Sequence, residues 1–286
     1  MRFRDLLLLT KPRLSGLVLV SAGVGLLLCP SGPPSVHGAF YILLGTALVV
    51  GGANAYNSYL ERDLDALMVR TRNRPIPAGR VRPEVAAWFG AVTALLGIVL
   101  LWLIQPLACL LAALAFASYA WVYTPLKRVT PLCTLVGALP GALPPMIGWV
   151  AVSGRLDPGA WLLFAWLFLW QPPHFLALAF LYEEDYRSAG MPMLPVVHGR
   201  GGLVERLMFL YTLLLIPLPM FLVAWSRAGS ITFVVTPILG LGFLAVIGFE
   251  WLKGTTPATA RASFSASILY LGLAFLTLLL DATITG

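Results

Sequence analysis

The chain has 286 residues, of which 59% are hydrophobic and only 11% are charged, and its mean hydropathy is +0.88. Soluble domains of this length carry about 25% charged residues, so this composition excludes a water-soluble globular protein and indicates a membrane protein. The net charge of +7 does not indicate nucleic-acid binding, because the basic residues follow a topological pattern instead.

Apolar runs near the ~20 residues needed to cross a bilayer recur along the whole chain. Nine such runs lie at residues 11–29, 36–60, 84–104, 106–123, 130–153, 159–182, 203–226, 230–252 and 262–282. The sequence lacks the alternating pattern of a transmembrane β-barrel, so helices are the expected spanning structure. We predict an all-α polytopic membrane protein with nine transmembrane helices, forming a single domain over residues 1–286.

The basic residues indicate how the helices are oriented. Nine spans place successive loops on alternate sides, and 17 of the 19 Lys and Arg residues then lie on the side of the N-terminus. Only Arg155 and Arg227 lie on the other side. The positive-inside rule therefore predicts a cytoplasmic N-terminus and, with nine spans, the C-terminus on the opposite side. We expect the protein to lie in the cell (plasma) membrane.

Two short acidic segments lie on this basic side, and the first follows the second run. Asn57, Glu61 and Asp65 are spaced at i, i+4 and i+8, so they share one face of a helix. Three oxygen-bearing side chains on one face are suited to Mg²⁺, which takes one or two carboxylates plus substrate phosphate oxygens. Asp63 lies about 100° away on a 3.6-residue helix, which favours a supporting role.

A group of basic residues follows at once, with Arg70 and Arg74 close to the acidic segment and Lys127 and Arg128 in the next loop on that side. One interpretation is a loop that attracts anionic lipid headgroups. Beside a carboxylate–metal site, a second interpretation gains weight, because the forked donors of Arg match phosphate. Mg²⁺ and Arg together neutralise a departing phosphate group.

The second acidic segment, Glu183-Glu184-Asp185, ends the sixth run. Upstream lies His174, directly after the pair Pro172-Pro173, which predicts a break or a kink in the helix. A histidine in a membrane helix is usually a packing residue, but His174 lies two to three turns from the acidic segment. Two carboxylate groups on one membrane face, ringed by arginine, indicate a clamp for a diphosphate whose allylic chain lies between apolar helices.

At these residues the sequence resembles the UbiA superfamily of intramembrane aromatic prenyltransferases, and within it the branch that farnesylates heme. The motifs that carry the resemblance span most of the chain. They are Leu9-Thr10-Lys11-Pro12-Arg13, Asn57-x-x-x-Glu61-Arg62-Asp63-x-Asp65, Met68-x-Arg70-Thr71-x-x-Arg74-Pro75, Tyr123-Thr124, Leu126-Lys127-Arg128-x-Thr130-Pro131, Gly141-Ala142-Leu143-Pro144-Pro145-x-Ile147-Gly148-Trp149, Trp170-Gln171-x-Pro173-His174-Phe175 and Asp185-Tyr186-x-x-Ala189-Gly190-x-Pro192-Met193-Leu194-Pro195-Val196-Val197.

The resemblance implies a nine-helix bundle around a central cavity that cytosolic loops cap. It implies transfer of a farnesyl group from farnesyl diphosphate to a vinyl group of heme B, with addition of water, to give heme O and diphosphate. Heme B is then a substrate rather than a prosthetic group. Heme A synthase and terminal oxidases are the partners that would use the product. The oligomeric state is not predicted.

The resemblance also implies roles for individual residues. Those expected to hold Mg²⁺ are Asn57, Glu61, Asp65, Glu184 and Asp185; those expected to bind diphosphate are Arg70, Arg74, Lys127 and Arg128; and His174 is expected to position the porphyrin, as a ligand of its iron. Three positions depart from the family pattern: Glu61 stands where Asp is usual, Cys133 stands where Asn is expected, and the second acidic segment lacks the usual Asp-x-x-x-Asp spacing. Which of its carboxylates contact metal stays open.

Charged residues in a membrane protein are also typical of two other functions. A related enzyme of the same superfamily would prenylate a quinone precursor or another aromatic acceptor, and the His174-Phe175 element argues against it. A transporter would also carry charged residues in its membrane helices. Transport sites usually lie near the midplane of the bilayer, whereas the acidic residues here cluster at one face.

Overall fold

The computed structural model describes residues 2–285, and every regular element in that range is a helix. The long helices are α2 (Pro12–Leu28), α3 (Val36–Leu60), α5 (Pro83–Ile104), α6 (Pro106–Ala117), α8 (Cys133–Ser153), α9 (Pro158–Leu181), α12 (Leu203–Leu215), α14 (Ser230–Lys253) and α15 (Pro257–Thr285). The short ones are α1 (Phe3–Leu9), α4 (Arg62–Leu67), α7 (Thr124–Leu126), α10 (Glu183–Ser188), α11 (Leu194–His198), α13 (Leu218–Leu222), a π-helical segment at Ser118–Tyr123 and a 3₁₀ segment at Val223–Trp225. The predicted all-α architecture is confirmed.

The number of membrane spans is eight or nine within residues 2–285. Eight helices, or continuous helical stacks such as Pro106–Leu126 and Leu203–Trp225, are long and apolar enough to cross a bilayer. The ninth is the bent pair of α1 and α2, whose axes differ by 51°. The predicted boundaries match these spans, including the tight connection at Gln105, whose side chain accepts a hydrogen bond from the backbone of Leu107.

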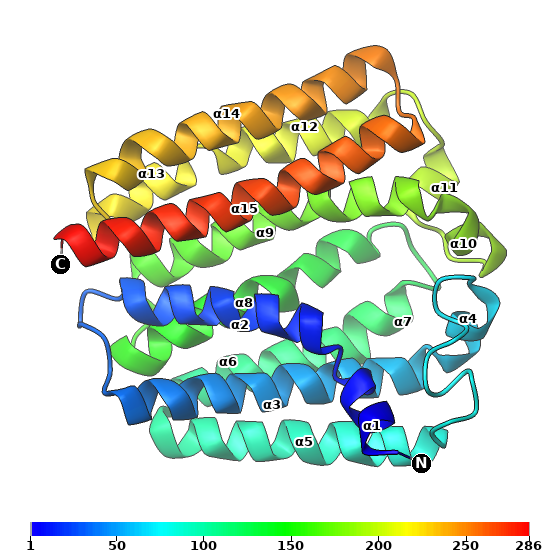
Figure 1. The fold of residues 1–286 in the computed structure, drawn as a ribbon, viewed down its shortest axis with the longest axis horizontal. Coiled ribbons are helices and arrows are strands. Elements are labelled where there is room, and N and C mark those ends of the chain that lie inside the picture. The colour runs from blue at the N-terminus through cyan, green and yellow to red at the C-terminus, as the bar shows by residue number, and fades with distance from the viewer. Residues whose placement is uncertain (1, 286) are drawn as a thin grey trace.

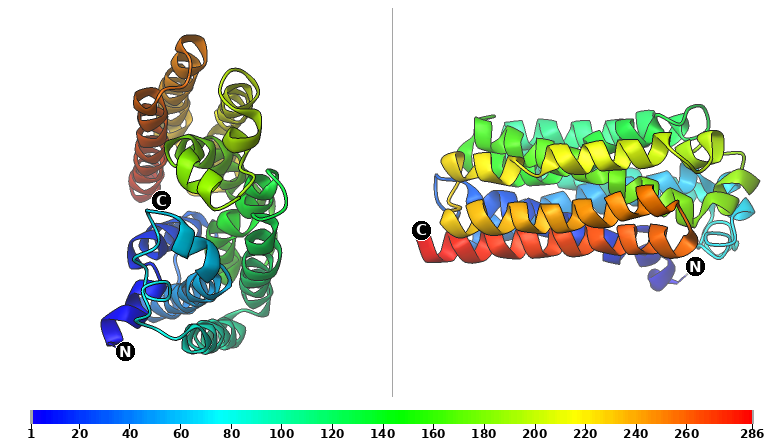
Figure 2. Two further views of the ribbon diagram at one scale, coloured as in Figure 1. Left: turned by 90° about the vertical axis from the view of Figure 1, so that its right-hand side faces the viewer. Right: turned by 90° about the horizontal axis from the view of Figure 1, so that it is seen from above.

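The helices lie side by side, and their two halves meet along α8 and α9 (Figure 2). In the N-terminal half α3 packs against α5, and in the C-terminal half α14 packs against α15. Helix α8 contacts α2, α6 and α9, so it joins the two halves. Helix α15 returns to contact α2, which brings the last span against the first.

Glycine allows α2 and α8 to approach closely. A Cβ atom on Gly25 would lie 1.9 Å from the carbonyl oxygen of Pro145, and one on Gly148 would lie 2.0 Å from that of Ala22. Small residues at helix crossings are the usual means of packing in a bilayer, where lipid tails are as apolar as the side chains. The position of α8 at the centre of the molecule therefore depends on these two glycines.

The sequence predicts a break or a kink at Pro172 and Pro173; the structure shows no break, because α9 continues from Pro158 to Leu181 through both prolines. Both are buried, and the neighbouring Gln171 donates through Nε2 to the carbonyl of Ala138 on α8 and to that of Leu167 on α9. Tertiary packing thus holds the helix together across the positions at which proline removes backbone donors.

Both acidic segments lie at one end of the bundle. Helices α4, α7, α10 and α11 gather at this end with the N-terminus, while the C-terminus lies at the other (Figure 1). The structure thus brings both acidic segments, which are far apart in the sequence, to the same end of the bundle.

Candidate active site

The first acidic segment lies where α3 gives way to α4. Glu61 separates the two helices, with φ −95° and ψ 4°. The helical hydrogen-bond pattern continues across it, because the amide of Glu61 donates to the carbonyl of Asn57 (2.9 Å) and that of Asp65 to the carbonyl of Glu61 (2.8 Å). The three side chains are all buried. They therefore follow one another along the junction of α3 and α4.

Two lysines from distant segments contact this row. Lys11 Nζ lies 3.0 Å from Asn57 Oδ1, and Lys127 Nζ lies 2.6 Å from Glu61 Oε1. Lys11 has a left-handed backbone with φ 50°, at the bend between α1 and α2. The bend thus directs the side-chain amino group of Lys11 into the site, although the sequence suggested Lys11 only as part of a motif.

Burial disfavours the charged form of Glu61, but the positive charges around it, Lys127 first and then Lys11 and Arg74, together outweigh that effect, so the pKa of Glu61 lies below its usual value. Burial also opposes the charge on Lys127, yet the Glu61 carboxylate raises the pKa of Lys127 well above its usual value. Both groups are therefore ionised at neutral pH.

Asp65 is held from a different direction. Arg74 donates through Nη1 to both of its carboxylate oxygens at 2.8 Å, and Thr71 donates to its backbone carbonyl at 2.8 Å. Both partners lie in the loop after α4. Asp65 therefore anchors this loop over the end of α3, and Arg74 is placed directly beside the acidic row.

The π-helical segment Ser118–Tyr123 and the residues directly after it also contact the acidic row and its lysines. Directly after it, Thr124 accepts a hydrogen bond from Asn57 Nδ2 through its hydroxyl at 3.0 Å. The ring centroid of Tyr123 lies 4.3 Å from Lys127 Nζ. A π-helical turn inside an α-helix often marks a functional site. Tyr123 and Thr124 belong to a sequence motif, but sequence analysis assigned them no role.

The other two predicted diphosphate ligands lie at the edge of this group. The guanidinium of Arg70 lies 4.7 Å from the ring centroid of Tyr182, and Arg128 donates to the carbonyl of Leu60 at 3.0 Å. Arg128 thus contacts the last turn of α3, beside the acidic row. Arg74 and Lys127 touch its carboxylates, whereas Arg70 and Arg128 flank them.

Asp185, from the second acidic segment, contacts the same loop. Its Oδ1 accepts from the amide of Val69 (3.1 Å) and its Oδ2 from the amide of Arg70 (3.2 Å). The structure thus brings the two acidic segments together through the backbone of the loop after α4. Asp185 ties α10 to that loop.

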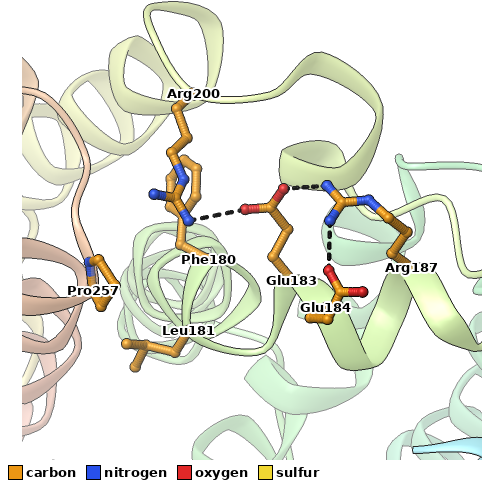
Figure 3. A pocket seen from close by; sticks show the side chains of 7 residues that line it. All are labelled: Phe180, Leu181, Glu183, Glu184, Arg187, Arg200 and Pro257. Atoms are coloured by element: carbon orange, nitrogen blue, oxygen red, sulfur yellow. Dashed lines mark hydrogen bonds and ion pairs between the residues drawn. The ribbon is translucent and has the colours of Figure 1, made fainter.

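Glu183 and Glu184 line an open cavity of about 470 Å³. Its lining is Phe180, Leu181, Glu183, Glu184, Arg187, Arg200 and Pro257 (Figure 3). Glu183 bridges Arg187 (2.5 Å) and Arg200 (3.3 Å). Glu184 is 84% exposed and pairs with Arg187 at 2.8 Å. These two carboxylates therefore engage surface arginines.

His174 lies on α9 and faces α15. Its Nδ1 is 2.7 Å from the hydroxyl of Ser267, and its ring is stacked between Trp170 and Phe264. The structure thus places His174 in an aromatic layer between two helices, about two turns from the end of α9 that carries the second acidic segment. Its partners on α15, Phe264 and Ser267, were not predictable from the sequence.

The donors of the acidic row suit a hard cation. Within residues 2–285 no three His, Cys, Asp or Glu side chains form a ready-made metal cluster. Carboxylate and amide oxygens, such as those of Asn57, Glu61 and Asp65, are nevertheless the kind of ligand that Mg²⁺ prefers, and this ion commonly adds phosphate oxygens to one or two carboxylates. The row thus fits a metal–diphosphate complex better than a metal ion bound by protein alone.

Comparison with known proteins agrees with this geometry. Residues 18–279 match the model of the UbiA prenyltransferase family. The protoheme IX farnesyltransferase of Myxococcus xanthus (strain DK1622) is 43% identical over 283 residues, which cover 97% of this chain and 94% of that protein.

Solved structures show the same fold. A digeranylgeranylglyceryl phosphate synthase superposes with a TM-score of 0.80 at 18% identity, over 98% of both chains. A UbiA homolog from Archaeoglobus fulgidus, bound to GPP and Mg²⁺, superposes with a TM-score of 0.66 at 19% identity, over 96% of this chain and 99% of that one. With a family match over most of its length and a close relative along nearly all of it, the chain belongs to the UbiA prenyltransferase family.

Proposed function

We propose that this protein transfers a farnesyl group from farnesyl diphosphate to a vinyl group of heme B, with addition of water, and releases heme O and diphosphate. The observation that carries the proposal is the 43% identity, along nearly the whole chain, to a protoheme IX farnesyltransferase. The buried row of Asn57, Glu61 and Asp65, with its cationic partners, supplies a site for the diphosphate end.

The diphosphate end is bound by the acidic row and its cations. Asn57, Glu61 and Asp65 would hold Mg²⁺, which neutralises diphosphate charge and so makes it a better leaving group. Arg74 and Lys127 contact the row in the structure, so each can exchange a carboxylate for a phosphate oxygen with little movement. Arg70 and Arg128 extend the positive charge around it.

The roles of Asp185 and Glu184 as metal ligands stay predictions. The contacts of Asp185 first support a role in holding the loop that carries Arg70 and Arg74. Glu184 is exposed and paired with Arg187, which supports a place at the surface.

The reaction then balances as follows. The bond between C1 of the farnesyl chain and the diphosphate oxygen breaks, and the electron pair leaves with diphosphate. The terminal vinyl carbon of heme B bonds to C1, a water oxygen adds to the inner vinyl carbon, and one proton is released. The ring of Tyr123 lies beside Lys127, and its centroid is 5.5 Å from that of Tyr119, so these rings would present π-electron density to the developing allylic cation. His174 would bind the iron and hold the vinyl group in place.

Heme O formation tests the proposal directly. The purified protein in lipid nanodiscs is incubated with heme B, farnesyl diphosphate and Mg²⁺, and the products are separated and weighed by mass spectrometry. We expect heme O, dependent on both substrates. A parallel reaction offers 4-hydroxybenzoate in place of heme B. A prenylated benzoate without heme O would overturn the proposal in favour of a quinone-precursor prenyltransferase.

The product also defines the class of partner. Heme O is consumed by enzymes that convert it to heme A or insert it into terminal oxidases, so we propose that such proteins receive it at the membrane. We also propose a location in the cell membrane, with the acidic segments on the cytoplasmic side, because the Lys and Arg residues are concentrated there.

A further inference from the structure

The imidazole of His174 is fixed on three sides. Trp170 lies on one face, with ring centroids 4.5 Å apart and planes 21° from parallel, and Phe264 lies on the other, at 4.8 Å and 27°. The third contact is the hydroxyl of Ser267, 2.7 Å from Nδ1. Trp170 is itself held, because its Nε1 donates to the backbone carbonyl of Ser267 at 2.8 Å. Rotation of the imidazole ring about its χ angles is thereby restricted.

The hydrogen bonds around Ser267 determine which nitrogen of His174 carries a proton. The Ser267 hydroxyl oxygen lies 2.6 Å from the carbonyl oxygen of Phe264. Two oxygens at that distance require a proton between them, and only the hydroxyl can provide it. Ser267 has no second proton, so toward His174 it must accept, and Nδ1 carries the hydrogen. In a neutral imidazole this leaves the lone pair on Nε2.

Nε2 is therefore the reactive atom of this ring. Within residues 2–285 it makes no hydrogen bond, and the side chain of His174 is only partly buried. A histidine that binds a metal almost always donates its other ring nitrogen to an oxygen acceptor, which fixes the tautomer and the ring orientation. Ser267 provides that acceptor here, from the neighbouring helix.

We propose that Ser267 is a positioning residue that fixes His174 in the Nδ1–H tautomer and presents Nε2 to the iron of the heme acceptor. The inference rests on the proposed function and extends it, since it names the ligating atom and the device on α15 that orients it. Trp170 and Phe264 hold the plane of the ring, and Ser267 determines which edge is free to bind iron.

The test measures heme ligation without turnover. Ferric heme B is added to the protein in nanodiscs without farnesyl diphosphate, and the absorption and electron paramagnetic resonance spectra are recorded. We expect a histidine-ligated signature in the wild type. His174→Ala should lose it, and added imidazole should restore it. Ser267→Ala should keep part of the signature but bind heme about 10-fold more weakly, the order of loss seen when a metal-ligating histidine loses its outer partner.

Matched variants separate positioning from folding. Ser267→Thr keeps the hydroxyl and should retain the wild-type spectrum. Thr277→Ala removes a hydroxyl from the same helix, one that donates only to the carbonyl of Leu273 at 2.8 Å, and should leave heme binding unchanged. Iron-free protoporphyrin IX should bind the wild type and Ser267→Ala with equal affinity, because it cannot engage Nε2.

Each result decides the inference. A His174→Ala spectrum identical to that of the wild type overturns it, as does Ser267→Ala behaving like Thr277→Ala. An equal weakening of heme B and protoporphyrin IX by Ser267→Ala also overturns it, because the residue would then merely shape the binding surface. A histidine-ligated complex that never yields heme O would sink the proposed function and leave the ligation intact. Heme O formation together with a heme spectrum that neither His174→Ala nor Ser267→Ala changes would support the proposed function and overturn the inference about ligation.

Discussion

Asp63 and Asp65 lie two residues apart on α4 but differ in burial and in the ion pairs that they form. Asp65 is 1% exposed and bound by Arg74 through both oxygens, whereas the side chain of Asp63 is 67% exposed and meets Arg62 at 3.7 Å. We expect Asp65→Asn to lower the rate of heme O formation about 100-fold, the order lost with one preorganised electrostatic group. Asp63→Asn should change it less than about twofold, because exposed ion pairs contribute little.

Initial rates at saturating substrates, measured side by side for the two variants, check this. Equal losses would mean that the charge of α4 as a whole, rather than the carboxylate of Asp65, supports the reaction.

The ion pair of Glu61 and Lys127 predicts a pH dependence. Burial raises the pKa of Glu61, but the surrounding positive charges, of which Lys127 is the strongest, together hold it below its usual value. In Lys127→Met burial remains and the main opposing charge is lost, so the pKa of Glu61 rises. As the pH is lowered, activity that requires the Glu61 carboxylate should then be lost at a higher pH than in the wild type. The acid limb of the pH–rate profile, where activity falls as the pH is lowered, therefore moves toward neutrality.

The measurement is kcat/KM for farnesyl diphosphate between about pH 5 and pH 8, where a carboxyl of raised pKa titrates. Lys127→Arg keeps the positive charge and should retain the wild-type limb even if its rate is lower. An unchanged limb in Lys127→Met would show that Glu61 ionisation does not depend on this pair.

At the scale of the helices, the crossing of α2 and α8 depends on glycine. A Cβ on Gly148 would lie 2.0 Å from a backbone oxygen of α2, so the helices must separate to admit it. Gly148→Ala should lower the free energy of unfolding by about 1–3 kcal/mol, the usual cost of overpacking. The control is Gly23→Ala on α2, where the added Cβ meets no atom within 4 Å, so this variant should be neutral or stabilising.

The prediction is checked by measuring the thermal unfolding midpoints of the two variants in the same detergent, where that of Gly148→Ala should be lower. Similar midpoints for both would indicate that α8 can shift relative to α2 at little cost.

The tie between α10 and the loop after α4 predicts a local change. Asp185→Ala removes the acceptor for the amides of Val69 and Arg70, so the loop should open more often. We expect faster trypsin cleavage after Arg70 and Arg72 and a raised KM for farnesyl diphosphate. Ser188→Ala, which removes a hydroxyl that donates to the carbonyl of Asp185, is the control and should change neither.

An Asp185→Ala protein with normal trypsin resistance but a higher Mg²⁺ requirement would show instead that this carboxylate binds metal directly. The two roles are thus separated by two independent measurements.

At the scale of the whole molecule, the distribution of charge predicts the orientation. The three native cysteines are buried, so only a cysteine added on the surface should react with a maleimide. In intact cells a membrane-impermeant maleimide should label Arg155→Cys, whereas Arg72→Cys should react only after the membrane is opened. The reverse pattern would place the acidic segments outside the cell.

The sequence was sufficient to predict the spans, the charged face and the row from Asn57 to Asp65, because these depend on hydropathy, loop charge and helical spacing within one segment. The partners of that row were not predictable. Lys11 and Lys127 reach it from 46 and 66 residues away, and such pairings are set by tertiary packing. For the same reason periodicity could not predict that Asp185 would meet a loop backbone.

The π-helical segment Ser118–Tyr123 has a consequence for how this site could arise and be lost. A π-helical turn is an α-helical turn that has gained a residue, and one residue corresponds to about 100° of rotation. Deleting a single codon here would turn Thr124 and Lys127 away from Asn57 and Glu61, yet the span would still cross the bilayer. In an alignment of descendants, a one-residue gap at this segment would thus mark lineages that kept the membrane fold and gave up the chemistry.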